Sequence, residues 1–346
     1  MWGRVMRVTL LAGMVFGLSA GQALPQSIDA NILTGGASGT YIQIGRDISA
    51  VLPADGVDLI VNESNGSLEN IYGVYKRPQT QLGIVQNDVL DFIRNLKASD
   101  AELNSLAAKV RLVMPLYNEE IHLVARPGLA GLSDLSQARV SVGPQDSGSQ
   151  LTASLLLDAT GVTPRKTVSL STTEALEAFL AGDIDAFFYV GGAPLKLLAD
   201  PRLTPENSQL LPLDDPRLAD YYVSSTIPAG TYAFQPTDYN GLAVKAVLMT
   251  YDFSSNPSSY FKQSCAIVTD VTRAVWENID ALKQSGHPKW QAVDLQDVPP
   301  GWEKDECVRR GEQLATGGDT VFSDPSQCGE IVNPITRQLC LSQTAK

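Results

Sequence analysis

The chain has 346 residues and a mass of 37.1 kDa, which is enough for two domains with substantial hydrophobic cores. Hydrophobic residues make up 44% of it and charged residues 18%, a composition typical of globular rather than disordered proteins. The 26 Lys and Arg residues stand against 38 Asp and Glu residues, giving a formal charge of -12. This balance excludes the basic surface with which proteins bind DNA or RNA.

The first residues, 1–23, have the pattern of an export signal. Arg4 and Arg7 precede a short apolar run, and the small residues Gly21 and Ala23 lead up to a cleavage site after Ala23. The run is too short to cross a bilayer of about 30 Å, although a retained N-terminal anchor is the alternative. We therefore expect a periplasmic mature chain with 24 basic and 38 acidic residues, a formal charge of -14.

All four cysteines lie in the last quarter of the chain. They are Cys265, Cys307, Cys328 and Cys340. The absence of a C-x-x-C spacing argues against a zinc site or a redox pair. In an oxidising compartment we expect two disulfides with three possible connectivities, and buried free thiols are the alternative. Because Pro and Gly are frequent near the end of the chain, we expect 301–346 to be an irregular extension that disulfide bonds of these cysteines hold in place.

From Ile28 onward, short apolar runs alternate with amphipathic stretches, which indicates α/β layering. The strands predicted in the first part are 28–33, 57–61, 82–85, 110–116 and 121–125. His122 falls on the polar side of the alternation in the last of these. Each of the first three strands runs into a loop of Gly, Ser, Asn or Gln residues.

A second, similar set of elements begins near Leu132, with strands predicted at 139–142 and 184–190. A helix after the first of these ends at Gly161, and a capping box of Ser171 and Glu174 starts another helix that ends at Gly182. The segments 210–213 and around Tyr221 indicate the return of the chain to the first domain.

The strand-to-helix loops suggest a binding function. The start of a helix presents unpaired backbone N–H groups and the positive end of the helix dipole, and glycine allows a ligand to approach closely. An anion held between two such sets of loops, one from each domain, is one interpretation. Ordinary tight turns with capped helices are the other.

The same loops resemble the TAXI-type solute receptors of TRAP transporters (tripartite ATP-independent periplasmic transporters). That family opens with a strand and T-G-G-x-x-G-x-Y, and Thr34, Gly35, Gly36, Gly39 and Tyr41 match this pattern. Further segments similar to the family follow in order at 64–70, 82–88, 134–149 and 182–194. The chain departs from many relatives at Ser38 and Ile42, where they carry a glycine and an aromatic residue.

The resemblance implies a type II periplasmic-binding-protein fold, an α/β fold in which two lobes close around a ligand cleft. Lobe I is then expected at 24–120 and 224–300, and lobe II at 121–223. The implied function is capture of a small organic anion, a glutamate-like amino acid or a dicarboxylate, for TRAP membrane subunits. We expect a monomer that uses no cofactor or metal.

The candidate ligand-binding residues all lie in these loops. They are Ser38, Gly39, Tyr41, Asn65, Ser67, Gln86, Ser147, Gly148, Ser149, Gly191 and Gly192. The serine hydroxyls and the amides of Asn65 and Gln86 are potential donors to ligand oxygens, and the glycines bring the backbone close. Asp88 is expected to cap the helix that follows it, and Arg126 to be either a counter-ion or a solvated surface residue.

An enzymatic function has little support in the sequence. Beyond the expected export signal at 1–23, whose residues 17–21 fit G-x-S-x-G by chance, the chain contains neither G-x-S-x-G, H-E-x-x-H nor G-x-x-x-x-G-K-[ST], and it has only two histidines. The first glycine loop has the spacing G-G-x-x-G, not the G-x-G-x-x-G of dinucleotide-binding proteins. A receptor that passes its ligand to a membrane signalling protein is the stronger alternative, and an exported hydrolase or transferase is the weaker one.

Overall fold

The computed structural model describes residues 28–37, 39–54, 56–317, 328 and 337. The predicted signal peptide, Ser38 and Cys340 lie outside the described residues. Among the helices of the described part, none is both long enough and apolar enough to cross a membrane.

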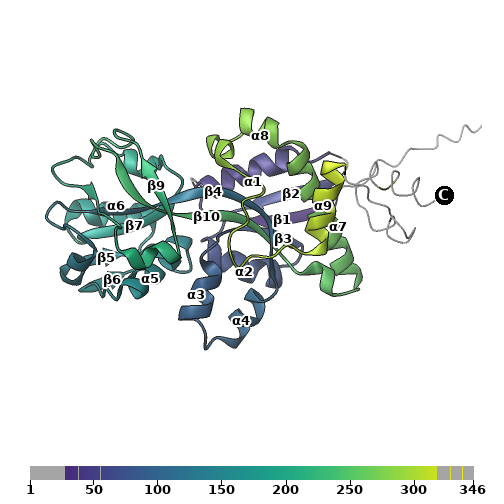
Figure 1. The fold of residues 1–346 in the computed structure, drawn as a ribbon, viewed down its shortest axis with the longest axis horizontal. Helices are drawn as coiled ribbons and strands as arrows, with labels where there is room; N and C mark the ends of the chain where they lie inside the picture. Colours follow the sequence, from purple (N-terminus) through teal and green to yellow (C-terminus); the bar gives the residue numbers. More distant parts are fainter. Residues whose placement is uncertain (1–27, 38, 55, 318–327, 329–336, 338–346) are drawn as a thin grey trace, which may run out of the picture.

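Two lobes lie side by side, and two long strands run from one lobe into the other (Figure 1). These strands are β4 (Val110–Ala125) and β10 (Tyr239–Tyr251), which pair antiparallel. The sequence predicts two short strands where β4 is continuous, because Asn118 and Glu119 interrupt its apolar pattern. Nearly all of β4 is buried, including these polar positions in part, since it crosses the centre of the molecule.

The first lobe is built on the strand order β2-β1-β3-β10. The first three strands are parallel, and β10 runs antiparallel to β3. The strands are β1 (Ile28–Leu33), β2 (Val57–Asn62) and β3 (Thr80–Gln86). The helices of this lobe are α1 (Thr40–Ala50), α2 (Ser67–Lys76), α3 (Val89–Leu96), α4 (Ala101–Ala107), α7 (Ser259–Glu277), α8 (Ile279–Ser285) and α9 (Glu306–Thr316).

The second lobe repeats this arrangement with the order β6-β5-β7-β4. Again three strands are parallel, and the fourth, β4, is antiparallel to its neighbour β7. The elements are β5 (Arg139–Ser141), α5 (Gly148–Thr160), β6 (Lys166–Val168), α6 (Thr172–Ala181) and β7 (Ala186–Gly191). Two such lobes, joined by a pair of crossing strands, form the type II periplasmic-binding-protein fold, so the predicted fold class is confirmed.

Local sequence signals fix several of these boundaries. Ser171 and Glu174 form the predicted capping box at the start of α6, in which each side chain accepts the backbone N–H of the other residue. Helices α5 and α6 end at Gly161 and Gly182, with left-handed φ values of 65° and 84°. Both predicted helix ends are therefore confirmed, because this conformation favours glycine.

The chain returns to the first lobe later than the sequence suggests. Strand β8 (Gln209–Leu210) pairs with the end of β4, and β9 (Val223–Ile227) pairs with the first half of β10. Leu211 and Tyr222 lie in the core of the second lobe. Ile227, Tyr232 and Phe234 also pack in a core of the second lobe with Phe187, so the crossing is made by β10 itself and not at the expected boundary of 223/224.

The C-terminal extension is also more regular than expected. Residues Glu306–Thr316 form α9, which lies along α7, and a disulfide joins Cys265 of α7 to Cys307 of α9. Cys328 is disulfide-bonded as well. The expectation of a disulfide-stapled extension is confirmed, whereas an irregular backbone from 301 onward is wrong for this helix.

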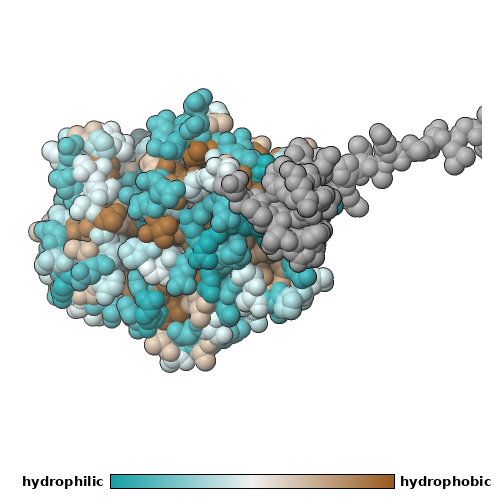
Figure 2. All heavy atoms as spheres, turned by 45° about the vertical axis from the view of Figure 1, so that its right-hand side comes forward, coloured by the Kyte–Doolittle hydropathy of each residue, from teal (hydrophilic) through white to brown (hydrophobic). Residues whose placement is uncertain are grey.

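The surface of the described residues is mostly hydrophilic on the face shown in Figure 2, and hydrophobic residues lie there in small separate groups. Such scattered apolar residues are ordinary for a folded surface.

Candidate ligand-binding site

A cavity of about 280 Å³ lies between the two lobes. Its lining comes from both lobes and from β4, which connects them. The lining residues are Gly35, Gly36, Gly39, Thr40, Tyr41, Ser64, Asn65, Gly66, Gln86, Glu119, Pro144, Ser147, Gly148, Ser149, Ser171, Thr172, Tyr189, Val190, Gly191 and Leu195. A cavity of this size between two lobes suits a small metabolite.

The cavity lies where the strand order reverses in each lobe. In both lobes the first strand of the lobe is central, with the second on one side and the third on the other. Apart from Glu119 of β4, the lining residues come from the carboxyl ends of these strands or from the segments that follow them. Open α/β sheets bind ligands at this place because neighbouring loops diverge there and leave a crevice.

Four helices begin at the cavity wall. Lining residues occupy the first turn or the cap of α1, α2, α5 and α6. The N-cap residues of α1 and α2 are Gly39 and Gly66, so no side chain caps these helices. The first N–H groups of a helix have no partner within it, and four helix dipoles add their positive ends. The wall is therefore suited to a negatively charged group.

Asn70 of α2 holds the loops of the first lobe together. Its side-chain amide donates to the carbonyls of Thr34 and Ile84, each at 2.7 Å, and the Ser64 hydroxyl donates to Asn70 Oδ1 at 2.6 Å. The three partners lie at the ends of β1, β3 and β2, and Asn70 is fully buried. It positions the loops without lining the cavity.

Ser147 and Ser149 hold the corresponding loop of the second lobe. The Ser147 hydroxyl donates to the Pro144 carbonyl at 2.7 Å and accepts the N–H of Gln150 as a helix cap. Ser149 Oγ accepts the backbone N–H of Val190 at 3.0 Å. Ser147 has thus used its only hydrogen, whereas the hydroxyl hydrogen of Ser149 is free to point into the cavity.

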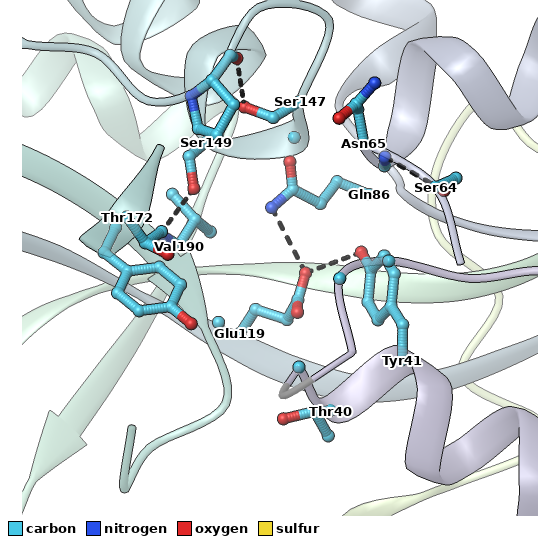
Figure 3. Close-up of a pocket in the computed structure, with 18 of the residues that line it drawn as sticks. Thr40, Tyr41, Ser64, Asn65, Gln86, Glu119, Ser147, Ser149, Thr172 and Val190 are labelled. Atoms are coloured by element: carbon cyan, nitrogen blue, oxygen red, sulfur yellow. Dashed lines mark hydrogen bonds between the residues drawn. The ribbon is translucent and has the colours of Figure 1, made fainter. Parts of the chain in front are cut away.

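Glu119 is the central polar side chain of the wall (Figure 3). Its Oε2 accepts the Tyr41 hydroxyl at 2.8 Å and the Gln86 amide at 3.2 Å, and the residue is only 4% exposed. Burial raises the pKa of Glu119 to about 8, although both hydrogen bonds oppose this shift. At neutral pH the carboxyl is therefore mostly protonated in the ligand-free protein.

Close contacts between the lobes show that the cleft is closed. The Thr152 hydroxyl of α5 lies 2.9 Å from Asp88 Oδ2 and 3.1 Å from Gln86 Oε1, both in the first lobe. Burial raises the pKa of Asp88 to about 7. With Asp88 protonated, the acid donates to Thr152 and Thr152 donates to Gln86, because a hydroxyl has one hydrogen. Asp88 does not cap α3 through its side chain, so that expectation is wrong.

Glu120 lies behind the cavity and is bound to the C-terminal part of the first lobe. Its carboxylate accepts Lys289 Nζ at 3.1 Å and the backbone N–H of Ala193 at 2.6 Å. Lys289 thereby reaches across to the loop after β7, which lines the cavity with Gly191 and Leu195. This pair fixes the position of that loop.

His122 is fully buried on β4, contrary to the expected polar side of a strand. Its Nδ1 lies 2.9 Å from the Glu120 carbonyl and 3.2 Å from the Tyr189 carbonyl, so Nδ1 carries the hydrogen. Nε2 accepts the Tyr232 hydroxyl at 2.9 Å. Burial lowers the pKa of His122 to about 4, so it is a neutral structural residue.

The described residues that line the cavity include no Lys, Arg or His. Arg126, the candidate counter-ion, lies elsewhere, with its guanidinium 4.8 Å from the centre of the Phe179 ring. Within the described part of the chain, no group of His, Cys, Asp or Glu is placed to hold a metal ion. Binding of an anion here therefore depends on N–H groups and hydroxyls.

A protein-family comparison identifies the chain. Residues 32–300, which include all the described cavity residues, match the model of the NMT1-like family. The chain belongs to the NMT1-like family.

Solved structures similar to this NMT1-like chain are distant in sequence. A putative periplasmic sulfonate-binding protein SsuA from Methylobacillus flagellatus is 15% identical, with 92% of this chain and 95% of that chain covered and a TM-score of 0.43. The GluR0 ligand-binding core from Nostoc punctiforme, in complex with L-glutamate, is 13% identical, with 76% and 95% covered and a TM-score of 0.43. At such distances, the ligand of one protein does not identify the ligand of the other.

The structure brings most of the predicted site residues of this NMT1-like chain to the cavity. Those that line it are Gly39, Tyr41, Asn65, Gln86, Ser147, Gly148, Ser149 and Gly191. Ser67 and Gly192 are not among the lining residues: Ser67 Oγ accepts the N–H of Gln86, and Gly192 packs against Lys289 and Tyr117. Ser38 lies outside the described residues.

Sequence reasoning missed several lining residues, above all Glu119, Tyr189 and Thr172. Glu119 lies inside a strand, not in a loop, and only its position in an otherwise apolar run distinguishes it. Thr172 follows Ser171 at the start of α6, and the capping box there was a usable signal. Nothing in the sequence pattern distinguishes Tyr189 from a packing residue of β7.

The two serines of the second lobe are expected to respond differently to alanine substitution. Ser149→Ala removes a free donor from the cavity and should weaken ligand binding by about tenfold, as loss of a hydrogen bond to a charged ligand does. Ser147→Ala removes a helix cap and should lower the free energy of unfolding by about 1 kcal/mol. Titration calorimetry and denaturant unfolding measure these effects. Equal loss of affinity in both variants would contradict the assignment.

The buried acids predict how stability depends on pH. Asp88 and Glu119 stay protonated in the folded chain at pH values where they are ionised in the unfolded chain. The folded chain then binds more protons, so the free energy of unfolding falls as pH rises from about 4 to 8. Below about pH 6.5 the lowered pKa of His122 acts in the opposite direction.

The fall in the free energy of unfolding is therefore clearest between about pH 6.5 and pH 8, where it should amount to about 2 kcal/mol. Denaturant unfolding of the ligand-free protein at the two pH values measures it. The double variant Asp88→Asn/Glu119→Gln should lack most of the decline. A wild-type stability that rises over this interval would show that the two acids are ionised in the fold.

Proposed function

We propose that the chain is an extracytoplasmic solute receptor, not an enzyme, that traps a small organic anion by closure of its two lobes. It delivers a glutamate-like amino acid or a dicarboxylate to a TRAP-type secondary transporter in the inner membrane. The observation that carries this proposal is the convergence of four helix N-termini on one small cavity between the lobes.

The chemistry of the cavity supports binding over catalysis. Its wall supplies N–H groups, hydroxyls and one carboxyl group, and the described lining offers neither a cysteine nor a histidine. The groups come from both lobes, so a ligand that contacts all of them favours the closed form. The candidate ligand contacts are Gly39, Tyr41, Asn65, Gln86, Gly148, Ser149 and Gly191.

The match to the NMT1-like family and the similarity to TAXI-type loops support the delivery step and the periplasmic location. Among the distant structural neighbours is a TRAP periplasmic solute-binding protein from Shewanella oneidensis with bound succinate, 12% identical with a TM-score of 0.40. We infer the transporter class from the loop motifs, because the similarity to the succinate-bound protein is too low to identify a transporter.

Native mass spectrometry of the mature chain, purified without unfolding, tests the proposal. One bound organic anion per chain is expected, lost on refolding and regained on addition of that compound. Cells that lack the protein should no longer take up the compound. A folded chain without a bound anion, or uptake that is unchanged in such cells, would contradict the receptor or the transport role respectively.

A further inference from the structure

The second oxygen of the Glu119 carboxyl makes no hydrogen bond within the part of the chain that the structure describes. Both hydrogen bonds to this group, from Tyr41 and Gln86, end on Oε2. Glu119 lines the cavity, and among the described residues none donates a hydrogen bond to Oε1, although the residue is almost fully buried. Figure 3 shows the carboxyl group at the centre of the lining residues. A carboxyl oxygen at the cavity wall that has no hydrogen bond to these residues is expected to meet a group of the ligand.

We propose that Glu119 Oε1 accepts a hydrogen bond from a protonated amino group of the ligand, so that the ligand is an amino acid. This inference rests on the proposed function and deepens it. The helix N-termini take the carboxylate of such a ligand, and Glu119 takes its ammonium group. A simple dicarboxylate has no donor for an ionised Glu119.

Glu119 is an acidic side chain in a wall that is otherwise suited to bind an anion. The backbone N–H groups and the Ser149 hydroxyl already offer donors to a carboxylate. An acidic side chain among them repels a second carboxylate unless it stays protonated, but it attracts an ammonium group. A ligand that carries both charges matches both parts of the wall.

Among the described charged and titratable groups around Glu119, none is available to neutralise its ionised carboxylate, so the ligand must do so. They are Tyr41 of α1, Tyr117 and Glu120 of β4, Tyr189 of β7 and Lys289. The tyrosines have raised pKa values and are neutral, and Lys289 is already paired with Glu120. No described cation is therefore left to neutralise Glu119 in the closed cleft.

Proton release distinguishes the two ligand classes. Since the pKa of Glu119 is about 8 in the ligand-free protein, an ammonium group must displace its proton to solvent. The affinity for an amino acid should then rise by up to about tenfold per pH unit between pH 6 and 8. A dicarboxylate would instead accept a hydrogen bond from protonated Glu119, and its affinity would fall over the same interval.

Titration calorimetry with two matched sets of probes tests this inference. One set is L-glutamate, L-glutamine and L-aspartate, and the other is glutarate, 2-oxoglutarate and succinate. The refolded wild-type chain should bind a member of the first set, more tightly at pH 8 than at pH 6. Glu119→Gln should weaken that binding at least about 100-fold and remove its pH dependence. Glu63→Gln, which changes the charge of an exposed residue outside the cavity lining, should do neither.

The outcomes separate this inference from the proposed function. Binding only of the second set, or affinity that falls with rising pH, would overturn the amino-acid assignment and leave the receptor function standing. Unchanged amino-acid binding by a folded Glu119→Gln variant would overturn the role of Glu119. Absence of binding by every probe would overturn both.

Discussion

Gly148→Ala is expected to weaken ligand binding by about 10- to 100-fold, because it places a methyl group where the lobes meet. A Cβ atom at this position would lie 2.4 Å from Gln86 Oε1 and 2.6 Å from Gln86 Cδ. Gln86 cannot move away freely, since its amide is bonded to Glu119 and Thr152. The overlap exists only in the closed form, so closure becomes less favourable.

The stability of the ligand-free chain should change little in this variant. Gly148 is the first residue of α5, and alanine is a better helix former than glycine. The measurements are the dissociation constant by calorimetry and the thermal unfolding midpoint without ligand.

Gly131→Ala is the matched control, because a Cβ at Gly131 meets no atom within 4 Å and its φ of -166° suits any residue. It should bind ligand as the wild type does. Wild-type affinity in Gly148→Ala would mean that the ligand does not require the closed form described here.

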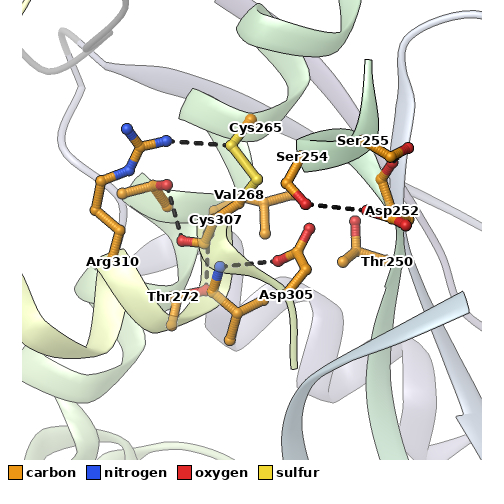
Figure 4. The surroundings of a disulfide bond; sticks show 12 residues. Thr250, Asp252, Ser254, Ser255, Cys265, Val268, Thr272, Asp305, Cys307 and Arg310 are labelled. Carbon is orange, nitrogen blue, oxygen red and sulfur yellow. Dashed lines mark hydrogen bonds between the residues drawn. A yellow bond between two sulfur atoms is a disulfide. The ribbon is translucent and has the colours of Figure 1, made fainter. Parts of the chain in front are cut away.

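Loss of the Cys265–Cys307 disulfide should have the largest effect on stability, about 4 kcal/mol for a crosslink that closes a 42-residue segment. The bond joins α7 to the start of α9 (Figure 4). Thr269 of α7 also donates to the Cys307 carbonyl at 2.9 Å, and a Cβ on Gly311 would lie 2.6 Å from the Thr269 carbonyl oxygen. The two helices are therefore in close contact, and the disulfide joins segments that also pack against each other.

Denaturant unfolding of Cys265→Ala/Cys307→Ala measures this contribution. Arg310→Lys is the control, since it removes a guanidinium contact to Cys265 Sγ but keeps the disulfide, and should cost less than about 1 kcal/mol.

Ligand affinity should be unchanged in the double variant, because none of the described cavity residues comes from α7 or α9. A loss of less than about 1 kcal/mol would show that packing alone holds α9. A folded variant that no longer binds would show that the extension acts on the cleft.

The loops of the site were predictable because each follows a recognisable strand and opens a recognisable helix. Gly39, Gln86 and Gly148 were found in this way, and all three line the cavity. The capping box at Ser171 and the helix end at Gly161 were readable for the same reason: they depend on residues close in sequence.

The features that were missed depend on contacts between distant segments. Glu119 and His122 lie in β4, and their burial follows from the passage of β4 between the lobes beside β10. The return of the chain was placed too early because the apolar segments near Leu211 and Tyr222 look alike whichever lobe they pack in. Helix α9 was taken for irregular chain because the Pro and Gly residues around it hid an 11-residue helical segment.

Titration calorimetry of the refolded mature chain is the most direct test of the central claim, that two closing lobes hold a small organic anion. We expect one anion to bind per chain, with a negative heat-capacity change as apolar surface is buried between the lobes. Gly148→Ala should bind the same compound more weakly. A folded, disulfide-intact chain that shows no binding to amino acids, dicarboxylates or 2-oxo acids would contradict the account.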